Sequence, residues 1–441
     1  MSSDWQPKRL GDYCLKIGSG ATPRGGKDAY LESGPFRLIR SQNVYNDGFS
    51  PAGLVFIGDD QARKLDGVAV QGGDVLLNIT GDSVARVCLA PNQYMPARVN
   101  QHVAIIRPNP KVFDSRFLRY FLASPWQQDL MLGLAAAGAT RNALTKGMIE
   151  DFLVPCPSIT VQEGIANFLS ALDDRIILLR ETNATLEAIA QAIFKSWFVD
   201  FDPVRAKQEG RIPEGMDEAT AELFPDSFEE SELGWVPKGW RYAFLSEAYS
   251  INPKRELKKG VAAPYLDMAN APIAGHCAED TILREMGSGS KYVNGDTLLA
   301  RITPCLENGK TAFVDFLAEE QVGWGSTEFV VLRPKAPLPE YHAYLLSRFP
   351  GFRDFAIQSM SGTSGRQRIQ NDVLGRYQLA LPSERVAEEF GHIIAALQQS
   401  ITANHAQALS LAGLRDTLLP RLISGKLRLP DANAELEAMA S

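Results

Sequence analysis

Long apolar runs and paired cysteines are scarce in this 441-residue sequence. No apolar run approaches the roughly 20 residues of a membrane-spanning helix, and the first ten residues lack the basic-then-apolar layout of a signal peptide. We therefore expect no membrane partner. The cysteines are scattered without a CxxC pair, which predicts reduced, mostly buried thiols in a cytoplasmic protein: Cys14, Cys88, Cys156, Cys277 and Cys305.

Catalytic and cofactor motifs are also missing. The sequence has no Asn/Asp-Pro-Pro-Tyr/Phe motif for amino methylation and no strand-anchored GxGxxG. Gly309-Lys310-Thr311 ends like a phosphate-binding loop, but Pro304 stands where the first glycine is required, so we interpret it as a turn. His276-Cys277 has no further ligands nearby, and we expect neither metal nor other cofactor. A stand-alone nuclease or methyltransferase is therefore disfavoured.

The chain has no excess of positive charge. Its net charge is −7, and the stretch from Pro203 to Gly234 alone carries −6, with nine acidic and three basic residues. The rest is balanced, so bulk charge neither demonstrates nor excludes binding to nucleic acid. We interpret residues 202–239 as an acidic linker.

A long heptad repeat is the strongest pattern present. Apolar residues recur every four and three positions from Ile165 to Trp197, interrupted only by the polar Asn183, which predicts a helix roughly 50 Å long that packs against another helix. The seam returns 225 positions later, from Phe390 to Leu422, with Asn404 as its polar residue. The two asparagines are candidates for a buried pair that fixes register. The alternative is two unrelated long core helices. The positions of the two seams are Ile165, Leu169, Leu172, Ile176, Leu179, Asn183, Leu186, Ala190, Ile193 and Trp197, and Phe390, Ile394, Leu397, Ile401, Asn404, Ala408, Leu411, Leu418 and Leu422, the second broken by Arg415.

The repetition extends into the sequence before each helix. The run Gly73–Leu77 is answered by Gly295–Leu299, and Val103–Pro108 by Phe329–Pro334. A polar loop containing Arg141 is answered by Ser361–Gln367. Short runs typical of strands lie at 36–39, 55–57, 74–77, 84–89 and 102–107, and helical periodicity covers 114–134 and 340–357.

These patterns predict an α+β fold in two tandem copies. The expected parts are α/β modules at 1–157 and 240–382, long helices at 158–201 and 383–428, the acidic linker and a tail at 429–441. Antiparallel pairing of the helices buries both seams and puts the modules at opposite ends, and the Gly425-Lys426-Leu427 turn can return to the first module. Such a layout suits a duplex read at two half-sites roughly 34–36 Å apart. Because the modules differ in loop sequence, the half-sites need not match.

Several motifs carry a resemblance over essentially the full length. They are Ser19-Gly20-Ala21-Thr22-Pro23, Ile39-Arg40-Ser41-Gln42-Asn43-Val44, the stretch Ile193–Phe201 and the stretch Leu419–Leu427. The chain resembles the DNA-specificity subunit of a type I restriction-modification enzyme, a family with two target-recognition domains, each followed by a conserved helix. The second module departs from the opening pattern, since it has Asn252-Pro253-Lys254-Arg255 and no close copy of the Ile39–Val44 run.

The resemblance implies a non-catalytic subunit that binds a bipartite, asymmetric site on double-stranded DNA. It also implies two methyltransferase subunits as partners and restriction subunits, which translocate DNA, joining the complex. A coiled-coil adaptor that binds only proteins is the competing hypothesis. It would show no sequence-selective DNA binding even with its partners added.

Candidate DNA contacts are loop residues whose side chains can reach base edges or phosphates. Arg40, Arg141 and Arg366 are the strongest, because they lie in repeated or family-like loops, whereas Arg107 and Arg333 beside prolines are expected to be structural. Trp197, Phe198 and Phe201 either dock a methyltransferase subunit or cap the core of the helix pair. The full set of DNA candidates is Thr22, Arg24, Lys27, Arg40, Ser41, Asn43, Arg86, Gln101 and Arg141 in the first module, and Lys254, Arg255, Lys258, Lys259, Arg301, Lys310, Ser326, Thr327, Arg366 and Arg368 in the second.

Overall fold

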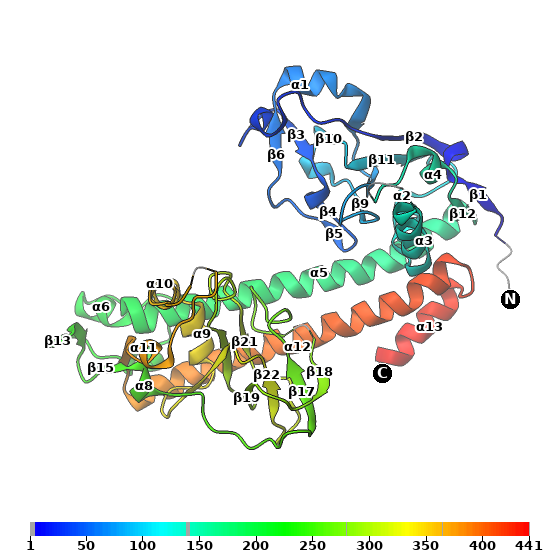
Figure 1. Cartoon of the computed structure of the whole chain (residues 1–441). Coiled ribbons are helices and arrows are strands. Elements are labelled where there is room, and N and C mark those ends of the chain that lie inside the picture. The colour runs from blue at the N-terminus through cyan, green and yellow to red at the C-terminus, as the bar shows by residue number, and fades with distance from the viewer. Residues whose placement is uncertain (1–4, 138–141, 279, 364, 441) are drawn as a thin grey trace. The chain divides into compact units, whose positions relative to one another are not determined.

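A computed structural model describes residues 5–137, 142–278, 280–363 and 365–440 (Figure 1). The chain divides into two compact units, one formed by residues 1–177 with 409–441 and the other by residues 178–408. Each unit contains one sheet-rich module and a segment of each of the two long helices. No helix in the described part of the chain combines the length and apolar character needed to cross a membrane.

The first unit is built on two four-stranded sheets. One sheet is antiparallel. Its strands β8 and β11 place Val75, Leu77 and Ile106 in a core that they share with α2, the helix that follows β11 in the chain. In the other sheet β3 runs parallel to β10. In spatial order the first sheet is β2 (Cys14–Ser19), β11 (Val103–Pro108), β8 (Val75–Asn78) and β9 (Val87–Leu89), and the second is β6 (Val55–Ile57), β3 (Phe36–Ile39), β10 (Ala97–Val99) and β7 (Ala69–Val70). The unit also has β1 (Pro7–Arg9) paired with β12 (Leu153–Pro155), β4 (Val44–Tyr45) paired with β5 (Gly48–Phe49), and α1 (Asp59–Lys64), α2 (Ser115–Ala123), α3 (Pro125–Ala136), α4 (Lys146–Glu150) and α13 (Leu429–Ala440).

The second unit repeats the two four-stranded sheets of the first, strand for strand. The antiparallel sheet has the same order, and in the other sheet β17 runs parallel to β22, as β3 does to β10. In spatial order the sheets are β16 (Tyr249–Ile251), β23 (Phe329–Pro334), β20 (Thr297–Ala300) and β21 (Thr311–Phe313), and β18 (Ile282–Glu285), β17 (Ala262–Leu266), β22 (Gly323–Gly325) and β19 (Ser290–Tyr292). The other elements are α6 (Asp202–Gln208), α7 (Glu218–Glu222), β13 (Phe228–Ser231) paired with β14 (Gly234–Pro237), β15 (Arg241–Phe244) paired with β24 (Gln378–Leu381), α8 (Leu245–Ala248), α9 (His342–Arg348), α10 (Pro350–Gln358) and α11 (Asn371–Leu374). The predicted internal duplication is confirmed.

A buried arginine–aspartate pair occupies the same place in both antiparallel sheets. Asp74 is almost fully buried and accepts hydrogen bonds of 2.7 Å from Nε and Nη2 of Arg107. Asp296 is fully buried and accepts one of 2.7 Å from Nε of Arg333. A buried carboxylate needs such a partner to offset its lost hydration. Arg107 and Arg333 are structural, as their positions beside prolines predicted.

The long helices α5 (Ile159–Lys195) and α12 (Glu384–Ile423) pack together in antiparallel fashion (Figure 1). In the first unit Ile165 and Leu169 share a core with Leu418 and Leu422. In the second unit Nδ2 of Asn404 donates to Oδ1 of Asn183 at 2.9 Å, and Nδ2 of Asn183 donates to the carbonyl of Ile401 at 3.0 Å. The predicted seam is confirmed, and its asparagines pair as expected but are half-buried rather than buried. The alternative of two unrelated core helices is excluded.

The seam's one charged interruption also has a partner. Nη1 of Arg415 lies 2.7 Å from Oδ1 of Asp173 on α5, and Nη1 of Arg119 on α2 lies 3.1 Å from the other oxygen of that carboxylate. The charge that breaks the apolar pattern is therefore compensated within the first unit.

Three boundaries differ from the sequence prediction. The expected helix over 114–134 is two helices, because Pro125 begins α3 after an extended Ser124, and Pro350 divides the helix expected over 340–357 in the same way. The segment expected to be a linker instead forms α6, α7 and the hairpin β13–β14. Its apolar residues Phe224 and Val236 are buried in the core of the second unit, which explains why it is ordered despite its acidity.

The tail returns to the first module as the sequence suggested. Leu427 and Ala432 are buried in the core of the first unit, and the Arg428 guanidinium lies 5.2 Å from the ring centroid of Trp5. The C-terminal turn and α13 are thus part of the first unit.

Candidate nucleic-acid interface

Loops from four parts of the first module converge at one place. The loop after β2 meets the loop after β10, where the backbone N–H of Gly20 donates to the carbonyl of Asn100 at 3.1 Å. The loop after β8 lies beside the same segment, since Ile79 N–H donates to His102 O at 2.9 Å. Leu144 N–H donates in turn to Ile79 O at 2.8 Å, which adds the loop before α4. A Cβ on Gly20 would lie 1.7 Å from the carbonyl oxygen of Val99, so this approach requires glycine.

The exposed polar side chains of this cluster are chemically suited to DNA. Thr22, Arg24 and Lys27 extend from the loop after β2 and are exposed. Gln101 is half-buried, with Nε2 2.9 Å from Nε2 of His102. Ser41 joins the cluster through its carbonyl, which accepts a 2.9 Å hydrogen bond from Nδ2 of Asn78. Guanidinium and ammonium groups can bind phosphates, and amides and hydroxyls can read base edges.

Two residues of the family-like opening pattern hold the loop itself. Asn43 is fully buried, and its Nδ2 donates to the carbonyls of Ser50 at 2.9 Å and Ala52 at 3.1 Å while its Oδ1 accepts from Arg40 N–H at 3.0 Å. The expectation that Asn43 contacts DNA is corrected, because all of its polar atoms serve the fold. Arg40 is half-buried, and its Nη2 donates to the carbonyl of Gly53.

The side chain of one predicted residue lies apart from this cluster, and another predicted residue is outside the part of the chain that the structure describes. The Arg86 guanidinium lies 4.8 Å from the ring centroid of Tyr45 and lines a cavity of about 340 Å3 together with Arg119 and Arg415. Arg141 lies outside the described residues. Its neighbour Asn142 is described, and its carbonyl accepts a 3.2 Å hydrogen bond from Gly81 N–H.

The second module brings together the equivalent loops by equivalent hydrogen bonds. Arg301 N–H donates to Glu328 O at 2.9 Å, as Ile79 does to His102, and Ile369 N–H donates to Arg301 O at 3.0 Å, as Leu144 does to Ile79. Ile369 in the second module therefore occupies the position that Leu144 has in the first. Thr327 and Arg366 are exposed there, and Ser326 is half-buried with its Oγ accepting from Glu328 N–H at 3.2 Å.

Arg368 and Arg301 are engaged within this second cluster. Nε of Arg368 lies 2.9 and 3.0 Å from the two carboxylate oxygens of Glu328, and its Nη2 lies 2.7 Å from Oε1. These hydrogen bonds from Arg368 lower the pKa of Glu328. Nη2 of Arg301 donates to Oε1 of Gln370 at 3.2 Å. The Arg368 charge is thus compensated inside the protein, and the residue positions the loop.

The remaining candidates of the second module separate into exposed and internal residues. Lys254, Lys258 and Lys259 are exposed on the loop after β16. Arg255 instead has Nη2 3.0 Å from Oδ1 of the buried Asp296, and Lys310 donates to the carbonyls of Met268 and Ala269. For Arg255 and Lys310 the expectation of DNA contact stays a prediction, and in this structure their charged groups are bound to internal acceptors.

The aromatic residues that follow α5 are core residues. Trp197, Phe198 and Phe201 are 5%, 6% and 5% exposed. The ring centroid of Trp197 lies 4.9 Å from that of Phe224, and the ring centroid of Phe198 lies 4.6 Å from that of Phe390. The expectation that they dock a partner is corrected, since they cap the core of the helix pair, which was the alternative.

A buried polar cluster in the second unit carries no signal in the sequence. Nδ1 of the fully buried His276 lies 2.8 Å from the Tyr341 hydroxyl, and its Nε2 lies 3.1 Å from Oδ2 of Asp315. Asp315 also accepts hydrogen bonds from Gln398 at 2.8 Å and from Thr402, both on α12. Although burial opposes ionisation, the hydrogen bonds lower the pKa of Asp315. The cluster joins the module to α12.

The described residues offer little catalytic chemistry. No three potential metal ligands among His, Cys, Asp and Glu gather within them. The five cysteines are unpaired, and burial raises the pKa of Cys14 and of Cys88 to about 12, which keeps both thiols protonated at neutral pH. Cys88 is buried, whereas the other four are half-buried, so the expectation of mostly buried thiols holds only in part.

The chain contains two copies of one α/β module, and polar loops converge in each copy. An antiparallel helix pair accompanies the two modules. Together these features define a duplicated recognition fold. Residues 2–188 match the family described as the Type I restriction modification DNA specificity domain. The chain is therefore similar to the specificity subunits of type I restriction-modification systems, by this match in its first part and by its relatives over nearly its whole length.

Two relatives can be aligned with this chain over nearly the full length of both proteins. The type I restriction enzyme HindI specificity subunit of Haemophilus influenzae is 24% identical, covering 96% of this chain and all of the relative. The MjaIX specificity subunit of Methanocaldococcus jannaschii is 24% identical, covering 97% of this chain and 94% of the relative. The crystal structure of a type I S subunit from M. genitalium has the same fold, with a TM-score of 0.55 at 15% identity, covering 95% of this chain and 96% of that one.

Proposed function

We propose that this chain recognises a bipartite, asymmetric site on double-stranded DNA and directs two methyltransferase subunits to it, with restriction subunits joining the assembled complex. The observation that carries the proposal is the repeated loop cluster. Hydrogen bonds through Ile79 in one module and Arg301 in the other gather equivalent loops, yet the side chains those loops present differ. The two loop clusters are built in the same way but present different side chains, so they fit two half-sites of different base sequence.

The chemistry of each cluster supports distinct roles for its residues. Arg24, Lys27 and the lysines at 254, 258 and 259 are exposed and suited to phosphates, which position a duplex without reading sequence. Gln101, Thr327 and Arg366 are suited to base edges. We assign target recognition to residues 1–157 and 240–382 and the spacer to residues 158–201 and 383–428. In this proposal the chain is a non-catalytic subunit and acts in the cytoplasm.

A titration of the full site at fixed salt tests this assignment. Arg366→Ala should weaken binding, by about 1–3 kcal/mol if the guanidinium reads a base. Arg385→Ala is the matched control, because Arg385 is exposed at the start of α12 in the same unit. Unchanged affinity of the Arg366 variant would remove this residue from the site. The adaptor alternative predicts no sequence-selective binding by the assembled complex and is not favoured by the family match.

A further inference from the structure

A turn in the loop cluster of the first module presents a single carboxylate. Val84 N–H donates to Gly81 O at 3.1 Å, which closes the turn. Gly81 N–H donates to the carbonyl of Asn142 at 3.2 Å, so the turn lies against the segment before α4. Asp82 is the second residue of this turn and is exposed. A negative charge therefore stands at the surface where the loops of this module converge.

The turn is held in one conformation by the residues that follow it. Ala85 is fully buried and has a φ of +72°, a left-handed conformation that is strained for a residue with a Cβ atom. Its N–H donates to Asn78 O at 2.9 Å, and its carbonyl accepts a 2.9 Å hydrogen bond from Nε2 of Gln128. Because the core and these hydrogen bonds maintain the strained residue, Asp82 is presented rigidly, and little conformational entropy would be lost when a ligand binds it.

No structural role accounts for the aspartate in this turn. Aspartate is frequent in turns because its carboxylate accepts a hydrogen bond from the backbone two residues further on. Within the residues that the structure describes, Asp82 makes neither that hydrogen bond nor any other, and it has no ion pair. The fold therefore does not require a carboxylate at this position.

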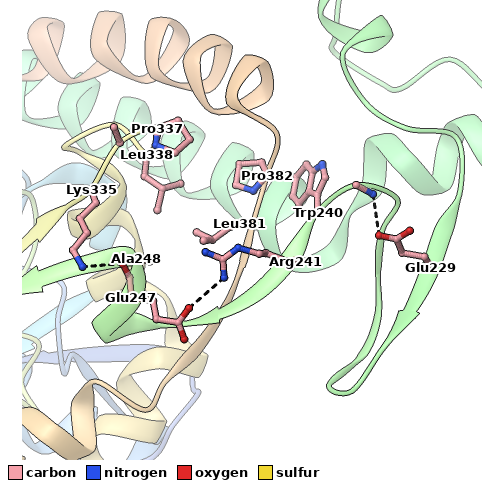
Figure 2. Close-up of a pocket in the computed structure, with 12 residues that line it drawn as sticks. Glu229, Trp240, Arg241, Glu247, Ala248, Lys335, Pro337, Leu338, Leu381 and Pro382 are labelled. Atoms are coloured by element: carbon pink, nitrogen blue, oxygen red, sulfur yellow. Dashed lines mark hydrogen bonds and ion pairs between the residues drawn. The ribbon is translucent and has the colours of Figure 1, made fainter.

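Two carboxylates beside a cavity of about 480 Å3 in the second unit show the contrast (Figure 2). Oε2 of Glu247 lies 3.3 Å from Nη1 of Arg241, and Oε1 of Glu229 accepts a hydrogen bond from Gly239 N–H at 3.1 Å. Both carboxylates have partners in the protein, whereas Asp82 keeps its charge for a ligand.

The sign of this charge limits which part of a duplex it can meet. Phosphates repel a carboxylate, so Asp82 is not one of the groups that hold the DNA backbone. In the major groove, guanine O6 and N7 and thymine O4 are acceptors, which a carboxylate also repels. Adenine presents a donor beside the acceptor N7, whereas the N4 amino group of cytosine is a donor alone. Cytosine is therefore the base that suits a carboxylate.

We infer that Asp82 determines specificity in the first half-site, because its carboxylate accepts a hydrogen bond from the N4 amino group of a cytosine. The inference rests on the proposed function and names one base pair of the DNA and the residue that reads it.

The duplication restricts this contact to one of the two half-sites. Thr303 N–H donates to Gln367 O at 3.0 Å in the second module, and this hydrogen bond is the equivalent of the one from Gly81 to Asn142. The next residue in the second module is Pro304. Because a proline side chain accepts no hydrogen bond, the second half-site has no counterpart of this cytosine contact.

The test first maps methylated adenines in DNA from cells that express the full chain with the methyltransferase subunit of its system. In the Asp82→Ala variant, one cytosine of the wild-type site should become replaceable by other bases. A titration of the assembled complex at fixed salt, with duplexes that differ only at this base pair, should show discrimination reduced at least about fivefold. Asp82→Asn should shift the preference toward adenine, because an amide accepts from adenine N6 and donates to N7.

Asp129→Asn is the matched control, because Asp129 is exposed on α3 of the same unit, and it should leave the methylated sequence unchanged. The other positions of the site should also stay the same in every variant. Thermal midpoints should match the wild type, since Asp82 has no partner in the fold.

An unchanged methylated sequence in both Asp82 variants would overturn the inference. So would loosening at a position that is not cytosine, loosening in both half-sites, or loss of all methylation with a normal thermal midpoint. The proposed function is scored separately by the wild-type complex. If that complex methylates a bipartite site while both variants keep it, only the role of Asp82 is refuted; if it methylates no such site, both are refuted.

Discussion

At the scale of single residues, Arg366 and Arg368 show how two arginines of one loop differ in role. Arg366 is exposed, whereas Arg368 is paired with Glu328 by three hydrogen bonds of 2.7 to 3.0 Å. The first is available to a ligand and the second holds the loop. They stand two positions apart in the sequence, and the partner that engages Arg368 is 40 positions away from it.

The pairing predicts a pH dependence of stability. Because Arg368 lowers the folded-state pKa of Glu328, the stabilisation is complete above the ordinary glutamate pKa of about 4.3 and is lost as the pH falls through the lower folded-state value. Arg368→Ala should lower the thermal midpoint at pH 7, and the difference from the wild type should shrink as the pH falls below 4. A difference that grows on acidification would contradict the assigned pairing.

Phe198 provides a second residue-scale prediction. Because it is 6% exposed and packs on Phe390, Phe198→Ala should lower the free energy of unfolding by about 3–5 kcal/mol. Chemical denaturation of the full chain measures this. A variant of wild-type stability that has lost only methyltransferase binding would restore the docking role that burial rules out.

The candidate site was predictable from the sequence in its loops but not in its individual side chains. The run Ile39–Val44, singled out by resemblance, does lie beside the loop after β8, because the Ser41 carbonyl accepts from Asn78. Whether a polar side chain faces solvent depends on partners distant in the chain: Arg255 meets Asp296, and Lys310 meets the carbonyls of Met268 and Ala269. No local pattern reports these contacts.

At the scale of elements, the asparagine pair ties α5 to α12. Asn183 and Asn404 bond to each other, and Asn183 also bonds to the Ile401 carbonyl. Asn404→Leu leaves Asn183 with one partner fewer in a half-buried seam and should lower stability by about 1 kcal/mol. The double variant with Asn183→Leu should lose less than the sum of the two single variants, a coupling of about 0.5–3 kcal/mol. Additive losses in a denaturation cycle would show that the pair does not act as a unit.

Long helices and their seam were the most predictable elements, because a heptad repeat over many turns has few competing structures. Short interruptions within the helical segments were less predictable. The apolar periodicity of 114–134 continues through Pro125, and only the proline marks the end of α2. The acidic segment was taken as a linker because its charge outweighed the widely spaced Phe224 and Val236, which decide its packing.

At the scale of the whole molecule, duplication is the feature from which function follows. Both modules share a strand order, a buried Arg–Asp pair and a loop cluster, while their exposed side chains differ. One construction used twice with different surface chemistry implies two independent recognition events in one chain. Replacing the loops of one module should therefore change one half-site and leave the other unaltered.

The central claim is tested most directly by mapping methylated adenines in DNA from cells that express this chain with the methyltransferase subunit of its system. We predict methylation at a single bipartite sequence, with two unlike half-sites separated by a spacer of constant length and unspecified bases. Methylation that is absent, that follows one contiguous sequence, or that tolerates any spacer length would contradict the account.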